Sequence, residues 1–89
     1  QKQVDEIQDI VFFDYRIIKT PIKDDDGNIM EYAFGVHEVF YDEDGKPITA
    51  TEKPLRAVGD SFNDLEVEIN NFLGAFDQPV LDWDTIQNN

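Results

Sequence analysis

The chain has 89 residues, of which 40% are hydrophobic and 12% aromatic, so it can form one small domain and is too apolar to be disordered throughout. It contains no cysteine, which excludes disulfides, thiolate zinc sites and cysteine nucleophiles. Twenty acidic side chains against seven basic ones give a net charge of -13. This charge disfavours binding to nucleic acid or to an anionic membrane surface and favours a basic partner. No apolar run reaches the roughly 18 residues of a membrane-spanning helix, so we expect a soluble domain.

The N-terminal half of the chain is predicted to form a β-hairpin. Residues 1–9 are polar and acidic, and we expect them to be a flexible arm. β-branched and aromatic residues dominate Ile10–Lys19 and Ile29–Tyr41, which are therefore the first two strands. The Asp-Gly step in Asp24–Asn28 supplies the positive φ that a tight turn between them needs.

The same turn pattern recurs directly after the second strand. Asp42–Lys46 contains a second Asp-Gly step, and Pro47–Glu52 reads as a shorter third strand. Pro47 and Pro54 bracket this strand, which suits the edge of a sheet because proline cannot donate to a further partner strand.

A single amphipathic helix is predicted between Ser61 and Phe76. Ser61 is a good N-cap residue, Asp64 completes an approximate capping box, and Pro79 prevents continuation. The apolar residues recur at intervals of three or four, so they share one helix face, which we name the helix stripe. Its members are Phe62, Leu65, Ile69, Phe72, Leu73 and Phe76.

These elements predict an α+β domain over residues 10–83, in which one C-terminal helix packs on one face of a three-stranded antiparallel meander (β-β-β-α). Residues 84–89 are expected to fray. Both faces of the first two strands are apolar: one carries Phe13, Tyr15, Ile17, Phe34, Val36 and Phe40, and the other Phe12, Ile18, Val39 and Tyr41. The helix covers only one face. The other therefore needs the tail at Pro79–Trp83, the N-terminal arm, a second copy of the chain or another partner.

Four segments resemble a family of small uncharacterised bacterial and phage proteins. They are Tyr15–Lys19, Val36–Ile48, Thr51–Pro54 and Pro79–Asp82. The most specific element is the His-Glu-Val-aromatic-Tyr-Asp-Glu-Asp-Gly-Lys-Pro hairpin that begins at His37. The family has no established activity, so the resemblance supports the order of elements and implies no catalytic residues. It implies a location in the cytoplasm of a bacterial or phage-infected cell.

No cofactor or metal site is expected. The two acidic turns contain the centre of an EF-hand loop, but alignment on Gly27 or Gly45 leaves Ala33 or Thr51 where the bidentate glutamate should stand. The sequence also lacks a nucleophile elbow and a glycine-rich phosphate loop.

Three polar side chains are predicted to form a row across the sheet. Two-residue Asp-Gly loops would align Arg16, His37 and Glu52 on one sheet face. Such a row could serve as a ligand or acid-base site. Mixed-charge ladders of this kind are more often structural, so we do not expect an enzyme.

The remaining acids form the candidate partner-binding set: Asp42, Glu43, Asp44, Asp60, Asp64, Glu66 and Glu68. Like charges four residues apart slightly destabilise a helix, so this pattern is not explained by helix stability. We therefore expect a non-enzymatic module that binds a basic protein surface, and one form of this function is imitation of the phosphates of nucleic acid. The alternative is a structural or assembly accessory that forms a homodimer through its uncovered sheet face.

Overall fold

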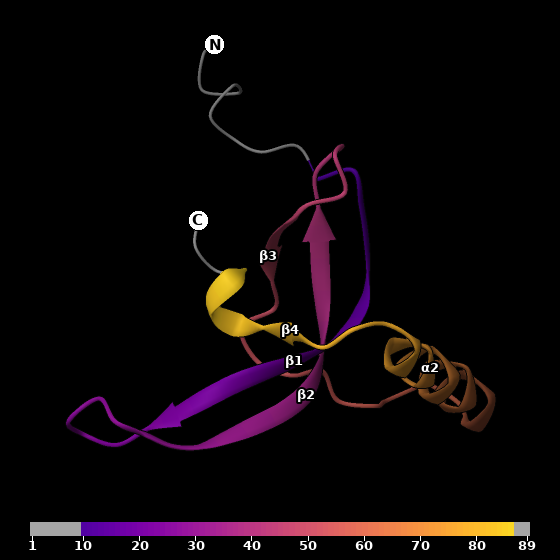
Figure 1. The fold of residues 1–89 in the computed structure, drawn as a ribbon. Helices are drawn as coiled ribbons and strands as arrows, with labels where there is room; N and C mark the ends of the chain where they lie inside the picture. The colour runs from indigo at the N-terminus through magenta and orange to yellow at the C-terminus, as the bar shows by residue number, and fades with distance from the viewer. Residues whose placement is uncertain (1–9, 87–89) are drawn as a thin grey trace, which may run out of the picture.

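The computed structural model describes residues 10–86, and the expected arm at 1–9 and the last residues 87–89 lie outside this range. The fold is α+β, with a four-stranded mixed sheet of order β3-β2-β1-β4 and one long helix (Figure 1). The antiparallel meander consists of β1 (Phe12–Lys23), β2 (Ile29–Tyr41) and β3 (Pro47–Ala50). The predicted meander is therefore confirmed, with a longer β1 and a shorter β3 than expected.

Both hairpin turns use glycine at positive φ, as predicted. Gly27 has φ 89° and Gly45 has φ 79°. The loops are longer than the two residues expected, because the chain closes through Asp24 N to Asn28 O and through Asp42 N to Lys46 O, each 2.9–3.0 Å. A register shift in the adjoining strands compensates for the extra residue. The predicted pairing along the strands is therefore retained.

The fourth strand was not predicted. β4 (Leu81–Asp82) pairs in parallel with β1 at Ile18 and Lys19, and a short 3-10 helix, η2 (Trp83–Thr85), follows it. The tail expected to dock on the sheet therefore does so as a strand. The folded part also extends beyond residue 83, because Ile86 is only 1% exposed and belongs to the core rather than to a frayed end.

The main hydrophobic cluster lies on one face of the sheet, which we name the core face, while Ile17 on the opposite face and Ala75 are buried outside it. Ile18, Val39 and Tyr41 of the sheet pack with Ile86, and Ala50, Leu81 and Trp83 add half-buried contacts. Phe12 stacks on Tyr41 with ring centroids 4.6 Å apart at the end of this face. The C-terminal segment 81–86 thus covers the sheet face on which Ile18, Val39 and Tyr41 lie.

The helix contributes much less to the core than expected. α2 (Phe62–Gly74) begins at the predicted cap, where Ser61 Oγ accepts from Asp64 N at 3.0 Å, and continues as the 3-10 helix η1 (Ala75–Asp77). No residue of α2 is buried. The helix stripe therefore does not form the hydrophobic core of the domain. Figure 1 shows the helix lying to one side of the sheet.

The helix touches the sheet along a line at the edge of its stripe. The Phe72 ring lies edge-on to Tyr15 at 5.4 Å, and Glu68 accepts a hydrogen bond from the Tyr15 hydroxyl at 3.1 Å. Ala75, one turn further, is 1% exposed. Glu68, Phe72 and Ala75 are spaced by four and three residues, so the docked line runs along one edge of the helix stripe and shares Phe72 with it. The neighbouring line of Phe62, Ile69, Leu73 and Phe76 is left exposed.

In the described residues, no helix is both long enough and apolar enough to cross a membrane.

The position of Ile86 gives a first prediction. Ile86→Ala should lower the free energy of unfolding by ~2–5 kcal/mol, because it opens a cavity in a small core. Ile29→Ala is the matched control, since Ile29 is 50% exposed and should matter little. Urea unfolding measures both variants, and equal midpoints would show that the C-terminal segment does not close the core.

Candidate functional site

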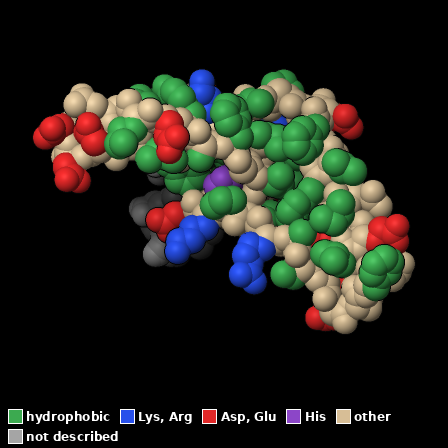
Figure 2. Space-filling model, turned by 90° about the horizontal axis from the view of Figure 1, so that it is seen from below, with side chains coloured by type: hydrophobic (Ala, Val, Ile, Leu, Met, Phe, Trp, Pro, Cys, Tyr) green, Lys and Arg blue, Asp and Glu red, His purple; other side chains and the backbone are tan. Residues whose placement is uncertain are grey.

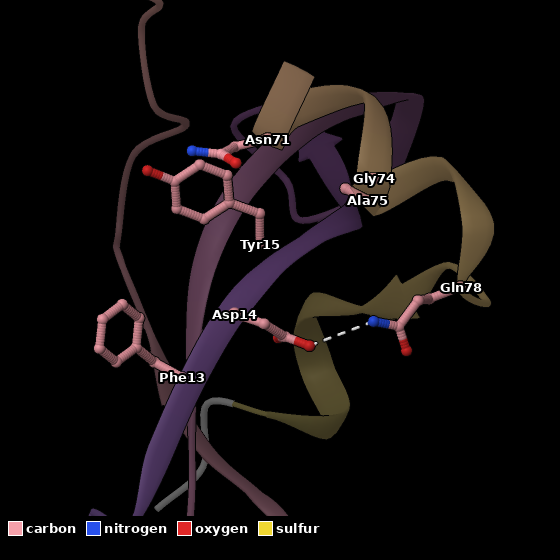
Figure 3. A pocket seen from close by; sticks show the side chains of 7 residues that line it. All are labelled: Phe13, Asp14, Tyr15, Asn71, Gly74, Ala75 and Gln78. Carbon is pink, nitrogen blue, oxygen red and sulfur yellow. Dashed lines mark hydrogen bonds between the residues drawn. The ribbon is translucent and has the colours of Figure 1, made fainter. Parts of the chain in front are cut away.

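Two polar side chains are buried in the described part of the chain, His37 at 3% and Arg16 at 8% exposed, and Arg16 makes the larger network. Its Nη1 donates to the Tyr41 hydroxyl at 2.9 Å, and its Nη2 donates to the Pro79 carbonyl at 2.8 Å. The Tyr41 hydroxyl donates in turn to Asp14 Oδ1 at 2.7 Å, and Gln78 Nε2 donates to Asp14 Oδ2 at 3.2 Å (Figure 3). This network joins β1, β2 and the segment after η1, so its evident role is structural.

Two tyrosines are perturbed where the elements meet. Burial raises the pKa of Tyr41, and the hydrogen bond to Asp14 raises it further, while Arg16 acts in the opposite direction. Burial also raises the pKa of Tyr15, and the Glu68 carboxylate adds to this effect. Both phenols therefore hold their protons more firmly in the folded chain than in the unfolded one.

The predicted polar row is formed only in part. Arg16 and His37 face each other across β1 and β2 as expected. His37 is 3% exposed, and its Nδ1 lies 2.9 Å from the Thr51 carbonyl oxygen. Glu52 does not continue the row, because β3 ends at Ala50 and Glu52 lies exposed in a bend.

Backbone bonding explains the loss of Glu52 from the row. Thr51 N donates to the Glu38 carbonyl, and the next bond to β2 comes from Leu55 N to the Val36 carbonyl. Glu52 and Lys53 therefore leave the regular backbone pairing with β2, although Pro54 returns to lie against Gly35. The spacing of residues in the sequence could not predict this break, because the alignment of Glu52 required a regular strand up to that residue.

The acids of the candidate partner-binding set differ in availability. Asp60, Asp64 and Glu66 of the helix region are exposed, as are Glu43 and Asp44 of the second turn. The carboxylates of Asp42 and Glu68 are already engaged. Asp42 Oδ1 accepts from the backbone N–H groups of Asp44 and Lys46, each at 2.9 Å, and Glu68 is half-buried against Tyr15. Asp60, Asp64 and Glu68 follow one another at four-residue steps, but Glu68 is not available to a partner in the way that Asp60 and Asp64 are.

The first turn repeats this capping arrangement. Asp24 Oδ1 accepts from the backbone N–H groups of Asn28 and Asp26, each at 2.9 Å. The bond from Asn28, followed by the others, lowers the pKa of Asp24. The turn acids therefore have a local structural use, as Asx-type caps. Within residues 10–86, no group of three or more histidine and carboxylate side chains is placed to hold a metal ion.

A large apolar surface surrounds the junction of sheet and helix. We name the sheet side opposite the core face the open face, which carries Phe13, Tyr15, Ile17, Phe34, Val36 and Phe40. Ile17 is buried, but Phe13 and Phe34 are 56% and 63% exposed. Figure 2 shows hydrophobic side chains over much of the side of the molecule that it presents. The sequence predicted that the face opposite the helix needs other cover, and the C-terminal segment supplies it on the core face. The face left partly exposed is the one that α2 contacts at Tyr15.

Two hollows lie within this surface. One, of about 330 Å³, is lined by Ile17, Phe34, Gly35, Val36, Phe76, Gln78 and Val80. The other, of about 390 Å³, lies between β1 and the end of the helix and is lined by Phe13, Asp14, Tyr15, Asn71, Gly74, Ala75 and Gln78 (Figure 3). The first is almost wholly apolar, so it suits a bulky apolar side chain better than a polar metabolite.

Comparisons with protein-family models, with curated proteins and with solved structures found no match for this chain. The family resemblance noted from the sequence therefore stays a prediction.

The Tyr41 network gives a second prediction. Tyr41→Phe should cost about 1–3 kcal/mol of unfolding free energy, because Arg16 and Asp14 each lose a buried hydrogen-bond partner.

The same network predicts how stability depends on pH. The stability that the Tyr15 and Tyr41 phenols contribute is fully present below the unfolded tyrosine pKa of about 10, and it is lost as pH rises through their higher pKa values in the folded chain. Urea unfolding across this alkaline range should show a shallower loss in the variant. An identical slope in parent and variant would contradict the assignment, and Tyr32→Phe, at an exposed ring, is the control.

Proposed function

We propose that this protein is a non-enzymatic interaction module, whose open face and helix stripe are covered by a protein surface in the working state. The observation that carries the proposal is the distribution of large apolar side chains. The open face and the helix stripe expose six large hydrophobic side chains, whereas only six hydrophobic side chains are buried among all the described residues. The exposed ones are Phe13, Phe34, Phe62, Ile69, Leu73 and Phe76. A soluble chain rarely leaves a contiguous apolar surface of this kind in water unless another molecule covers it.

The polar groups of the domain support the same reading. The histidine that would serve as an acid or base is nearly fully buried and lies against a backbone carbonyl. The two terminal nitrogens of Arg16 are engaged with Tyr41 and the Pro79 carbonyl. An assembly accessory needs neither group for chemistry, and both are explained by their structural contacts.

A basic partner is the second candidate, and the charge distribution favours it. No lysine or arginine follows Arg56 in the chain, whereas Asp60, Asp64 and Glu66 are exposed in and beside the helix. Carboxylates at the edge of an apolar surface would steer a basic protein surface toward it. Imitation of nucleic-acid phosphates is one form of this candidate.

Salt separates the two candidates. Association with a basic surface weakens as salt is added, and it weakens further when Asp60, Asp64 and Glu66 are replaced by their amides. A designed peptide of leucine and lysine is a suitable probe, with fluorescence anisotropy at low and high salt as the readout. Apolar association with an acidic or neutral surface does not show this loss.

The proposal predicts that the open face is dispensable for folding. Phe34→Ser and Phe76→Ser should each change the free energy of unfolding by less than ~1 kcal/mol, because these side chains are 63% and 68% exposed. Ile18→Ser, at a fully buried position, should destabilise strongly and is the control. Chemical denaturation at low protein concentration measures all three. A loss of several kcal/mol at Phe34 would mean that the chain covers this face itself and would sink the proposal.

A further inference from the structure

We propose that the partner is a second copy of this chain, and that the helix of each copy covers the open face of the other in a reciprocal dimer. This inference rests on the proposed function and names the occupant of its surface. The chain carries two unpartnered apolar surfaces of complementary kind. One is the part of the open face around Phe13 and Phe34 that α2 leaves exposed, and the other is the helix line of Phe62, Ile69, Leu73 and Phe76.

The exposed surface of α2 is identified by which of its residues contact its own sheet and which do not. Its contacts with its own sheet run along Glu68, Phe72 and Ala75. The next line on the same helix consists of Phe62, Ile69, Leu73 and Phe76, which are 83%, 41%, 58% and 68% exposed. This line has the spacing of a core-facing helix, yet its own sheet does not cover it. Helix propensity alone does not require large apolar residues at these positions.

The sheet surface lies close to the helix but is not filled by it. Phe34 of the open face and Phe76 at the end of the helix line opposite sides of the 330 Å³ hollow, together with Val80. The hollow therefore joins the two exposed surfaces into one. A second copy related by a two-fold axis would meet the same combined surface and could insert its helix line where this chain leaves the sheet open.

The exposed area is sufficient for a stable dimer. Phe13, Phe34, Phe62 and Phe76 are 56–83% exposed. An aromatic side chain buries ~150–250 Å², so these four and their aliphatic neighbours offer on the order of 800 Å² per chain, the share of each partner in an interface of standard size. A reciprocal contact also closes at two copies, so it does not lead to open-ended polymers.

Charge sets how the dimer should respond to salt. Each chain carries a net charge of -13, so two copies repel each other at low ionic strength. The exposed helix line itself contains no acid, and the open face carries the acid Glu38 and the base Lys19 besides its apolar side chains. Added salt should therefore strengthen the dimer, which is the opposite of the response expected for a basic partner.

The absence of cysteine makes the arrangement directly testable. Phe34→Cys is placed in one chain and Leu73→Cys in a second, size-tagged chain, and the mixture is treated with a short bismaleimide cross-linker. Val67→Cys is the matched control for the helix, because Val67 is 54% exposed against 58% for Leu73 but lies on the opposite helix face. We expect at least a fivefold excess of cross-linked product for the Phe34 and Leu73 pair over the Phe34 and Val67 pair. Sedimentation should find a dimer that strengthens with salt.

Other outcomes overturn the proposal and show which part has failed. A dimer in which Phe34 cross-links to Phe34 of the other copy would indicate a sheet-to-sheet interface, which refutes the helix exchange and leaves the proposed function standing. A monomer in which a chain with both substitutions cross-links internally would show that the helix closes on its own sheet. That result, with a large loss of stability in Phe34→Ser, would refute the proposed function as well. A monomer without internal cross-linking, which binds the leucine and lysine peptide, would refute the dimer and favour the basic partner.

Discussion

The packing of the C-terminal segment 81–86 on the core face is the contact on which the rest of the structure depends. The three-stranded meander alone would leave Ile18 and Val39 in water, and two or three strands without cover are marginally stable. Ile86 and the half-buried Leu81 and Trp83 complete the core on this side. Two residues before this segment, the Pro79 carbonyl accepts a hydrogen bond from Arg16. An apolar and a polar contact therefore fix the end of the chain against the sheet.

This one-sided core explains why the helix is free for another use. In a small α+β domain the helix usually provides the second layer of the core. Here the C-terminal segment occupies that role on the core face, and α2 is held mainly through Tyr15. The helix stripe keeps the residue types of a core-facing helix without being buried in the chain itself. Association between chains accounts for both facts.

Local chemistry made much of the fold predictable from the sequence. The Asp-Gly steps fixed both turns, and the constant pairing that followed from them placed Arg16 opposite His37 correctly. Ser61 marked the start of the helix. These features depend on neighbouring residues or on hairpin register, where sequence patterns are informative.

Features that depend on distant contacts were not predictable in the same way. Leu81–Asp82 is too short to read as a strand, and its parallel pairing with β1 is set by tertiary packing. The periodicity of the helix stripe identified an apolar face but could not say which surface covers it. Glu52 failed to join Arg16 and His37 because the backbone after Ala50 departs from a regular strand. The half-buried position of Glu68 likewise depends on Tyr15, which lies far away in the sequence.

The central claim is that the main hydrophobic cluster of the domain lies on one sheet face. We propose that α2 stays weakly attached until a second chain covers it. Amide hydrogen exchange followed at several protein concentrations tests this most directly. The account predicts slow exchange in β1 and β2 around Ile18 and Val39 at every concentration. It also predicts fast exchange in α2 in dilute solution and clear protection of α2 as the concentration rises. Protection of α2 equal to that of the central strands in dilute, monomeric protein would contradict the account.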